Sequence, residues 1–179
     1  MATFAIIRGK NVILVMDVQY NEQMANAVVA GILFESWQSP QAYRKLTQII
    51  DHIEPYQAGE FYKRELPCLL ALLKQVSEPL EAIVIDGFVT LDVDQHAGLG
   101  MHLYQALAEK TPVIGVAKRY FMGTPQICQL YRGESQNPLY ITAAGISIEQ
   151  AKQCIADMAG QYRLPSLIKA VDQLCRAIG

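Results

Sequence analysis

Two short apolar runs, each leading to an aspartate, constrain the fold of this chain most strongly. The run Asn11–Val18 (NVILVMDV) is rich in β-branched residues and carries Asp17 near its end. The run Ala82–Ile85 (AIVI) is followed directly by Asp86. Continuous apolar runs of this length are typical of strands buried on both faces. We therefore expect a buried sheet that presents both aspartates at the ends of strands.

The rest of the N-terminal half predicts two more strands and a helix. Ala25–Phe34 has the apolar pattern of a second strand. Leu46–Glu54 alternates as a third strand does, although Ala42–Ile53 also fits a helix. The leucine spacing of Leu66–Gln75 predicts a helix with Pro67 in its first turn, where proline is tolerated.

The C-terminal half alternates helices and strands. Ser147 and Gln150 form a capping box, and Pro165 opens a final amphipathic helix. Strands and helices alternating in this way predict an α/β fold, a mixed sheet flanked by helices, in a single domain spanning residues 1–179. The expected elements are helix Leu99–Ala108, strand Pro112–Val116, a hairpin of Ile127–Tyr131 with Leu139–Thr142, and helices Ile148–Ala159 and Pro165–Ile178.

Composition narrows the class of protein. Hydrophobic residues make up 51% of the chain and charged residues 18%, which excludes a disordered tail. Apolar runs such as Ala27–Phe34 are shorter than the ~20 residues of a membrane-spanning helix. Arg8 and Lys10 follow the apolar Phe4–Ile7, the reverse of a secretory signal, so we expect a cytoplasmic protein without membrane association. The four cysteines are scattered without a CxxC pair and are expected to be free thiols.

Three carboxylates are the strongest candidates for chemistry. Asp17 and Asp86 are expected at strand ends, and Glu65 at the entrance to a helix. Converging carboxylates repel one another unless a hard cation neutralises them, and Mg²⁺ prefers oxygen ligands. Their spacing alone also fits ordinary strand-end caps or members of ion pairs, so both interpretations stay open at this point.

The blocks around these acids resemble the endonuclease V family in chain order. DVQY, beginning at Asp17, resembles the family's D-V-x-Y motif, and PYQAGEFYKRE, ending at Glu65, is similar to its P-Y-x-P-G-x-L-x-F-R-E. VIDG around Asp86 and IGVAK ending at Lys118 also resemble family motifs. Weaker likenesses are GLGMHL at residues 98–103, PLYIT at 138–142 and YRLP at 162–165.

The chain departs from the family pattern at several positions. Ala58 and Lys63 replace a proline and a phenylalanine of the second motif. Asp92 stands where the family carries a histidine, with His96 close by in sequence. A later family histidine is absent because its segment has shrunk to residues 143–145. Asp92 is therefore either a replacement oxygen ligand or a loop acid outside the site, and both remain open.

The resemblance implies a ribonuclease H-like fold and a metal-dependent nuclease. Asp17, Glu65 and Asp86 would hold Mg²⁺, or alternatively Mn²⁺, with Asp92 as a further candidate ligand. Lys118 would lie near the phosphate as a catalytic residue, although a solvated lysine after a strand is an equal alternative. The partner would be DNA or RNA containing a deaminated purine, cut on the 3′ side, one nucleotide beyond deoxyinosine or inosine, by an enzyme expected to be a monomer.

The same resemblance implies four residues for substrate binding. Tyr56 would act as a wedge beside a base turned out of the stack, and Tyr20 of the first motif would be a further contact. Gly59 and Gly87 would let backbone amides approach that base. The alternative for Tyr56 is a loop aromatic that covers the edge of the core.

Two other functions compete with an active endonuclease. The missing histidines favour a paralogue that binds the modified strand without cutting it. A different ribonuclease H-like nuclease or an interaction domain is the third possibility. The intact set of three acids favours the enzyme, since a binding protein has no need of such a cluster of like charges.

Overall fold

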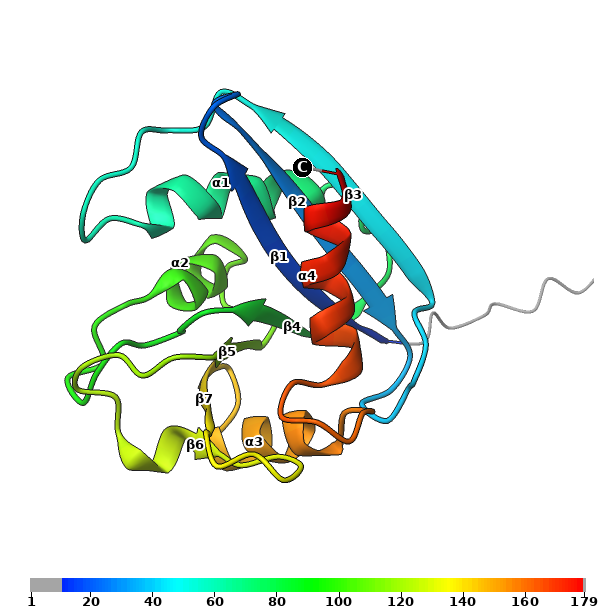
Figure 1. Cartoon of the computed structure of the whole chain (residues 1–179), viewed down its shortest axis with the longest axis vertical. Coiled ribbons are helices and arrows are strands. Elements are labelled where there is room, and N and C mark those ends of the chain that lie inside the picture. Colours follow the sequence, from blue (N-terminus) through cyan, green and yellow to red (C-terminus); the bar gives the residue numbers. More distant parts are fainter. Residues whose placement is uncertain (1–10, 179) are drawn as a thin grey trace, which may run out of the picture.

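The computed structural model describes residues 11–178, and these are built around one seven-stranded sheet (Figure 1). The strand order is β3-β2-β1-β4-β5-β7-β6. The strands are β1 (Val12–Asn21), β2 (Asn26–Phe34), β3 (Arg44–Asp51), β4 (Leu80–Asp86), β5 (Val113–Ala117), β6 (Gln129–Leu130) and β7 (Leu139–Ala144). The helices are α1 (Tyr62–Leu73), α2 (Leu99–Ala106), α3 (Ile148–Asp157) and α4 (Ser166–Ile178), with a short 3₁₀ helix at Gln126–Cys128.

The pairing of the strands brings three parallel strand ends to one edge of the sheet. β1, β2 and β3 form an antiparallel meander. β4 pairs parallel to β1, and β5 pairs parallel to β4. α1 lies between β3 and β4 in the chain, and α2 lies between β4 and β5, so each parallel strand is reached by a crossover connection. Asp86 at the end of β4 and Lys118 just after β5 consequently lie at the same edge of the sheet, on neighbouring strands.

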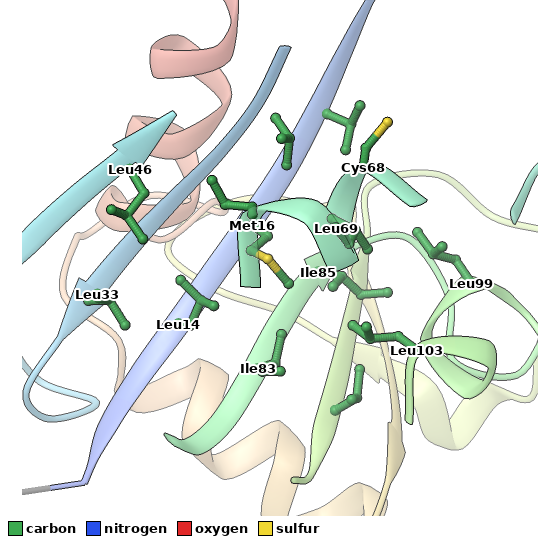
Figure 2. Close-up of a cluster of buried hydrophobic side chains, with 14 of the residues drawn as sticks. Leu14, Met16, Leu33, Leu46, Cys68, Leu69, Ile83, Ile85, Leu99 and Leu103 are labelled. Carbon is green, nitrogen blue, oxygen red and sulfur yellow. The ribbon is translucent and has the colours of Figure 1, made fainter. Parts of the chain in front are cut away.

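Helices cover both faces of the sheet and explain the continuous apolar runs. α1 and α2 pack on one face, against side chains such as Leu14, Met16 and Ile85 (Figure 2). α3 and α4 pack on the other face, against Ile13 and Val15. Successive side chains of a strand point to opposite faces, so residues 12–16 of β1, which are buried on both sides, must be apolar at every position.

Most of the elements predicted from the sequence are confirmed. The third segment is a strand rather than a helix. Of the predicted hairpin strand Ile127–Tyr131, only residues 129–130 pair antiparallel with β7, because Ile127 and Cys128 lie in the 3₁₀ helix. The capping box is present: the Gln150 amide donates to Ser147 Oγ over 3.1 Å, and the Ser147 amide donates to Gln150 Oε1 over 3.1 Å. All four cysteines are free, and Cys68, Cys128 and Cys175 are buried.

Two predicted boundaries are wrong, and both bear on the acids. β1 continues to Asn21, so Asp17 lies inside the strand rather than at its end. The polar residues after Asp17 stay in the strand because they pair with β2, from Gln19 opposite Val28 to Asn21 opposite Asn26. α1 begins at Tyr62, so Pro67 lies in the helix interior and the first turn contains Glu65 instead.

The segment Phe4–Ile7 with Arg8 and Lys10, on which the prediction about a secretory signal depends, lies outside the described residues. Within residues 11–178, no helix has both the length and the apolar character needed to cross a bilayer.

Thr142 tests how the sheet holds the loop after β4. The buried Oγ1 of Thr142 accepts a 2.8 Å hydrogen bond from the amide of Val89. Thr142→Val should lower the free energy of unfolding by about 1–3 kcal/mol, because that amide loses its partner in a dry environment. Urea denaturation measures the change. Thr47→Val on β3 is the matched control and should cost less than about 0.5 kcal/mol; equal effects of the two would contradict the assignment.

Candidate active site

Asp17 and Asp86 lie on adjacent parallel strands at the centre of the sheet. Met16 of β1 is in register with Ile85 of β4, so the next residues along the two strands are these aspartates. Asp17 is only 9% exposed, and its Oδ1 accepts a 2.8 Å hydrogen bond from the amide of Val18. Strand pairing therefore forces two carboxylates together at the edge of an apolar core.

Glu65 joins the two aspartates from the first turn of α1. It is 7% exposed, and the charges of Asp17 and Asp86 both act on it. Helix α1 packs across β1 and β2, which turns its first turn toward the aspartates. Arg64 beside it is also buried and pairs with Glu22 over 2.6 Å. The structure therefore brings the three predicted acids into one electrostatic cluster.

The pKa values of two of these acids show that the cluster lacks positive charge. Burial, followed by the charge of Asp86, raises the pKa of Asp17 to about 7. Burial, followed by the charges of Asp17 and Asp86, raises the pKa of Glu65 to about 8, against a smaller lowering by Arg64. Ordinary carboxyl groups of these types titrate near 4. Negative charge is therefore unfavourable here without a counter-ion.

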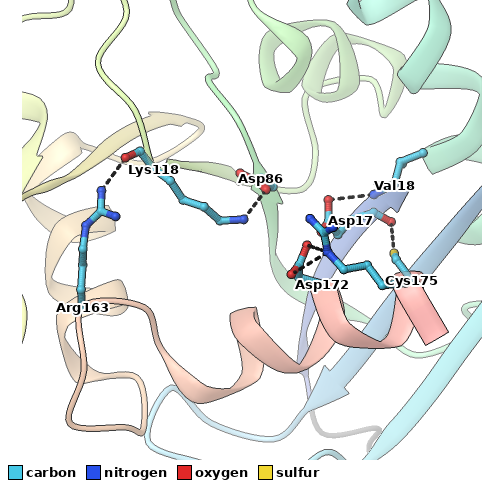
Figure 3. Close-up of polar contacts among 8 residues, drawn as sticks. Asp17, Val18, Asp86, Lys118, Arg163, Asp172 and Cys175 are labelled. Atoms are coloured by element: carbon cyan, nitrogen blue, oxygen red, sulfur yellow. Dashed lines mark hydrogen bonds and ion pairs between the residues drawn. The ribbon is translucent and has the colours of Figure 1, made fainter. Parts of the chain in front are cut away.

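Lys118 supplies part of the missing positive charge. Its Nζ lies 2.8 Å from Oδ2 of Asp86 (Figure 3). Burial disfavours the charged ammonium, but the hydrogen bond to Asp86 and the nearby aspartate charges outweigh burial and raise the pKa of Lys118. Lys118 is therefore paired with an acid of the cluster rather than purely solvated, and its place near the phosphate stays a prediction.

Helix α4 adds two residues that the sequence analysis did not identify. Asp172 lies beside Asp17 in Figure 3, and its charge contributes to the raised pKa of Asp17. Its carboxylate is held by Arg176 Nε at 3.1 Å from each oxygen. Cys175 Sγ donates to the carbonyl of Asp17 over 3.1 Å. The signal in the sequence is weak: an acid directly after buried Val171 in an amphipathic helix.

A cavity of about 240 Å³ opens directly beside the acids. Its walls combine two of the three acids with backbone and aromatic side chains from the loop before α1 and the loop after β4. The lining residues are Gly59, Phe61, Tyr62, Glu65, Asp86, Gly87, Phe88, Leu91, Ala97, Gly98 and Leu99. A flat ring can be enclosed by such walls while its attached chain remains at the carboxylates.

Phe61, which lines this cavity, also contacts two tyrosines. Tyr56 is 61% exposed and meets Phe61 edge-on at 6.4 Å between ring centroids. Phe61 also contacts Tyr20, whose ring lies 4.2 Å from the Arg64 guanidinium carbon. The hydroxyl of Tyr20 is buried without a hydrogen-bond partner among the described residues. Tyr56 is therefore available to a ligand, whereas Tyr20 lies beneath Phe61 and Arg64.

The two predicted glycines both take conformations that favour glycine. Gly59 has φ +79° and Gly87 has φ +129°, and both line the cavity. The amide of Gly87, however, donates a 3.1 Å hydrogen bond to the carbonyl of Val116. The link between β4 and β5 therefore uses this amide, and the approach of backbone amides to a base beside Gly59 and Gly87 stays a prediction. Gly87 leaves space for a ligand only by lacking a side chain.

Asp92 lies in a different cluster from Asp17, Glu65 and Asp86. His96 Nδ1 lies 2.7 Å from Asp92 Oδ2, and the amide of Asp94 donates to Asp92 Oδ1 over 3.1 Å. Potential ligand atoms of Asp92, Asp94 and His96 lie within 4.8 Å of one another, so this group could hold a metal ion. Asp94 and His96 are exposed. The described structure therefore contains two acidic groups, one buried beside the cavity and one on the loop.

Residues 5–173 match the family described as Endonuclease V. The chain belongs to the endonuclease V family. Among its relatives, Endonuclease V of Streptomyces avermitilis is 24% identical over 181 residues, which cover 90% of this chain and 77% of the relative. Membership places the chain among the nucleases.

Solved structures of the family share its fold. Endonuclease V from Bacillus subtilis superposes with a TM-score of 0.77 at 20% identity, covering 94% of this chain and 80% of that one. Endonuclease V of Ciona intestinalis, in complex with a 23mer DNA containing an inosine followed by a ribo-adenosine, gives 0.76 at 19% identity, covering 98% and 88%. The predicted ribonuclease H-like α/β fold is confirmed.

The raised pKa values predict an unusual dependence of stability on pH in the metal-free protein. The unfolded carboxyls of Asp17 and Glu65 ionise near pH 4, whereas the folded ones hold their protons to about 7 and about 8. The folded state binds more protons in this window, so its stability should fall as pH rises, by up to about 1.4 kcal/mol per pH unit for each carboxyl.

Urea unfolding in EDTA across that window measures the slope. Asp17→Asn should flatten it, because the amide cannot ionise. Asp51→Asn, an exposed change at the end of β3, should leave it unaltered. A stability that rises with pH and is insensitive to Asp17→Asn would contradict the electrostatic description of the cluster.

Proposed function

We propose that this protein is a metal-dependent endonuclease that cleaves a phosphodiester on the 3′ side of deoxyinosine or inosine in DNA or RNA. One observation carries the proposal. Buried Asp17 and Glu65, whose pKa values are raised, lie with half-buried Asp86 beside Lys118. Glu65 and Asp86 line a cavity together with glycines and aromatic rings. Family membership and the inosine-containing DNA bound by the Ciona relative support the same substrate class.

The donor set fits a divalent cation of the Mg²⁺ or Mn²⁺ type. Asp17, Glu65 and Asp86 offer only hard oxygen atoms, the ligands that these ions prefer. The raised pKa values of Asp17 and Glu65 show that added positive charge would stabilise the ionised forms. We propose these three residues as the ligands. The loop group of Asp92, Asp94 and His96 is the competing location.

The protein residues would position the strand for hydrolysis. The cavity would receive the base turned out of the stack, and Tyr56 would occupy the space that the base leaves. Extrusion costs a few kcal/mol, least for a poorly paired base such as inosine, and aromatic stacking recovers about 1–3 kcal/mol. Lys118 would direct its ammonium toward the phosphate next to Asp86. A bound cation would supply activation of water and neutralise charge developing on the phosphodiester.

A paralogue that binds without cutting is the second candidate. The absent family histidines favour it, and Asp92, the residue at one of those positions, lies with His96 on the exposed loop. The presence of Lys118 together with all three acids in one cluster favours the enzyme. A monomeric state and a cytoplasmic location remain predictions from the sequence.

Cleavage of an end-labelled oligonucleotide with a single inosine tests the proposal. The wild-type protein should nick it near the inosine with Mg²⁺ or Mn²⁺ and not with EDTA. Asp86→Asn should lower the single-turnover rate by at least about 100-fold, because a charge-stabilising group at the reacting phosphate is lost.

Asp51→Asn, the surface aspartate on β3, should leave the cleavage rate unchanged. If wild type and Asp86→Asn both bind the oligonucleotide and neither cuts it with either ion, the enzyme proposal fails and the binding paralogue remains.

Calorimetric titration with Mn²⁺ separates the two candidate metal locations without reference to activity. Asp17→Asn should weaken binding at least about 10-fold, because even the loss of a group that only orients a metal ligand typically costs that much affinity. Asp92→Asn, on the exposed loop, should leave the same binding event intact. The reverse pattern would place the ion on the loop and reject the buried acids as its ligands.

A further inference from the structure

A second cavity lies on the far side of Lys118 from the carboxylates. It has a volume of about 300 Å³ and begins where β5 ends. Residues from three separate parts of the chain line it: Lys118, Arg119, Tyr120, Asn137, Pro138, Tyr140 and Arg163. Lys118 belongs to both places, because its ammonium reaches Asp86 while the residue also forms a wall of this cavity.

The charge of this cavity is opposite to that of the acidic cluster. Three of its lining residues are cationic and none is acidic. The chain as a whole carries a net charge of -2, so this arrangement does not follow from composition. Arg119 is exposed, and no ion pair or hydrogen bond of its side chain is found within residues 11–178. The cavity therefore presents positive charge to solvent that the described protein does not neutralise.

Arg163 forms the fixed part of the cavity. Its Nη2 donates to the carbonyl of Lys118 and, over 2.8 Å, to the carbonyl of Pro138. These bonds tie the end of β5 to the start of β7. The Nε of Arg163 is buried and has no hydrogen-bond partner in the described structure. A cation held this rigidly stays in place whether or not a ligand is bound, which lowers the ordering cost of binding.

Tyr120 provides an aromatic wall next to these cations. It is 59% exposed, and its ring packs against Tyr140 with 5.9 Å between centroids. Its hydroxyl accepts a 3.1 Å hydrogen bond from the amide of Gly123, which fixes the ring from the other side. Basic side chains combined with a held, exposed aromatic ring are typical of surfaces that follow a single nucleic-acid strand.

We propose that this cavity binds a backbone phosphate that neighbours the scissile one, with Arg119 as the adaptable ligand and Arg163 as the fixed one. The inference rests on the proposed function, in which Lys118, a wall of this cavity, would also contact the reacting phosphodiester. The positive charge of the cavity favours an anionic ligand. Its open, partly aromatic wall favours a nucleic-acid strand over a free phosphate ion. The subsite would hold the strand in register while the extruded base occupies the first cavity.

Binding measurements in EDTA test the subsite independently of cutting. The probe is a short single-stranded oligonucleotide with one inosine, in which each backbone linkage in turn is replaced by an uncharged methylphosphonate. In wild type, one linkage next to the scissile one should weaken binding several-fold when neutralised. In Arg119→Ala that replacement should weaken binding less than it does in wild type, because only Arg163 still contacts the phosphate. The slope of log affinity against log salt should fall by about 0.7, as expected for the loss of one cationic contact.

Two variants serve as controls for the charge and its position. Arg119→Lys should recover most of the salt slope because it retains the cation. Lys110→Ala removes an exposed lysine before β5, at the opposite end of that strand, and should behave as wild type at every linkage. If Arg119→Ala and Lys110→Ala give the same slopes and the same linkage profile, the proposal is overturned.

A separate titration with inorganic phosphate distinguishes the two sources of the anion. Tight binding of inorganic phosphate that depends on Arg119, with no effect of Arg119→Ala on the oligonucleotide, would assign the cavity to a free phosphate and overturn the backbone subsite. If the linkage effect depends on Arg119 but the wild-type protein cuts with neither metal ion, the endonuclease proposal is rejected and the phosphate subsite is retained. If the wild-type protein cuts and Arg119→Ala changes neither the salt slope nor the linkage profile, the subsite is rejected and the endonuclease proposal is retained.

Discussion

Repulsion among buried carboxylates is the constraint on which the site depends. The register between β1 and β4 places Asp17 and Asp86 side by side, and α1 adds Glu65 from above the same strands. Folding alone cannot favour three negative charges in this place, and the raised pKa values of Asp17 and Glu65 express that cost. The rest of the architecture has to tolerate this destabilising cluster, which is typical of groups kept for chemistry rather than for stability.

The positively charged side chains around the three acids compensate their negative charge to different extents. Lys118 pairs directly with Asp86, whereas Arg64 is engaged with Glu22 and the ring of Tyr20 and only partly relieves Glu65. The remaining arginines near the site serve as structural ties or line the outer cavity, as Arg163 does. Lys118 thus lies between the acids, which it contacts through Asp86, and the cationic outer cavity, which it also lines.

The departures from the family pattern concentrate outside this cluster. Asp92, at a histidine position of the family, pairs with His96 on the loop after β4 and shares its oxygen atoms with backbone amides there. The shortened segment at residues 143–145 ends β7, where the chain turns into the capping box of α3. Both positions lie outside the strand register that brings Asp17 and Asp86 together.

The sequence by itself predicted the three acids of the cluster, Lys118, and most of the elements that hold them. Apolar runs buried on both faces predicted β1, β2 and β4, and local hydrogen bonding predicted the start of α3 at Ser147, because both signals depend on neighbours in the chain. Only the tertiary structure decided that Asp17 lies within its strand, that Asp172 joins it from α4, and that Arg163 ties β5 to β7. These depend on contacts between residues far apart in sequence, and no local periodicity encodes such contacts.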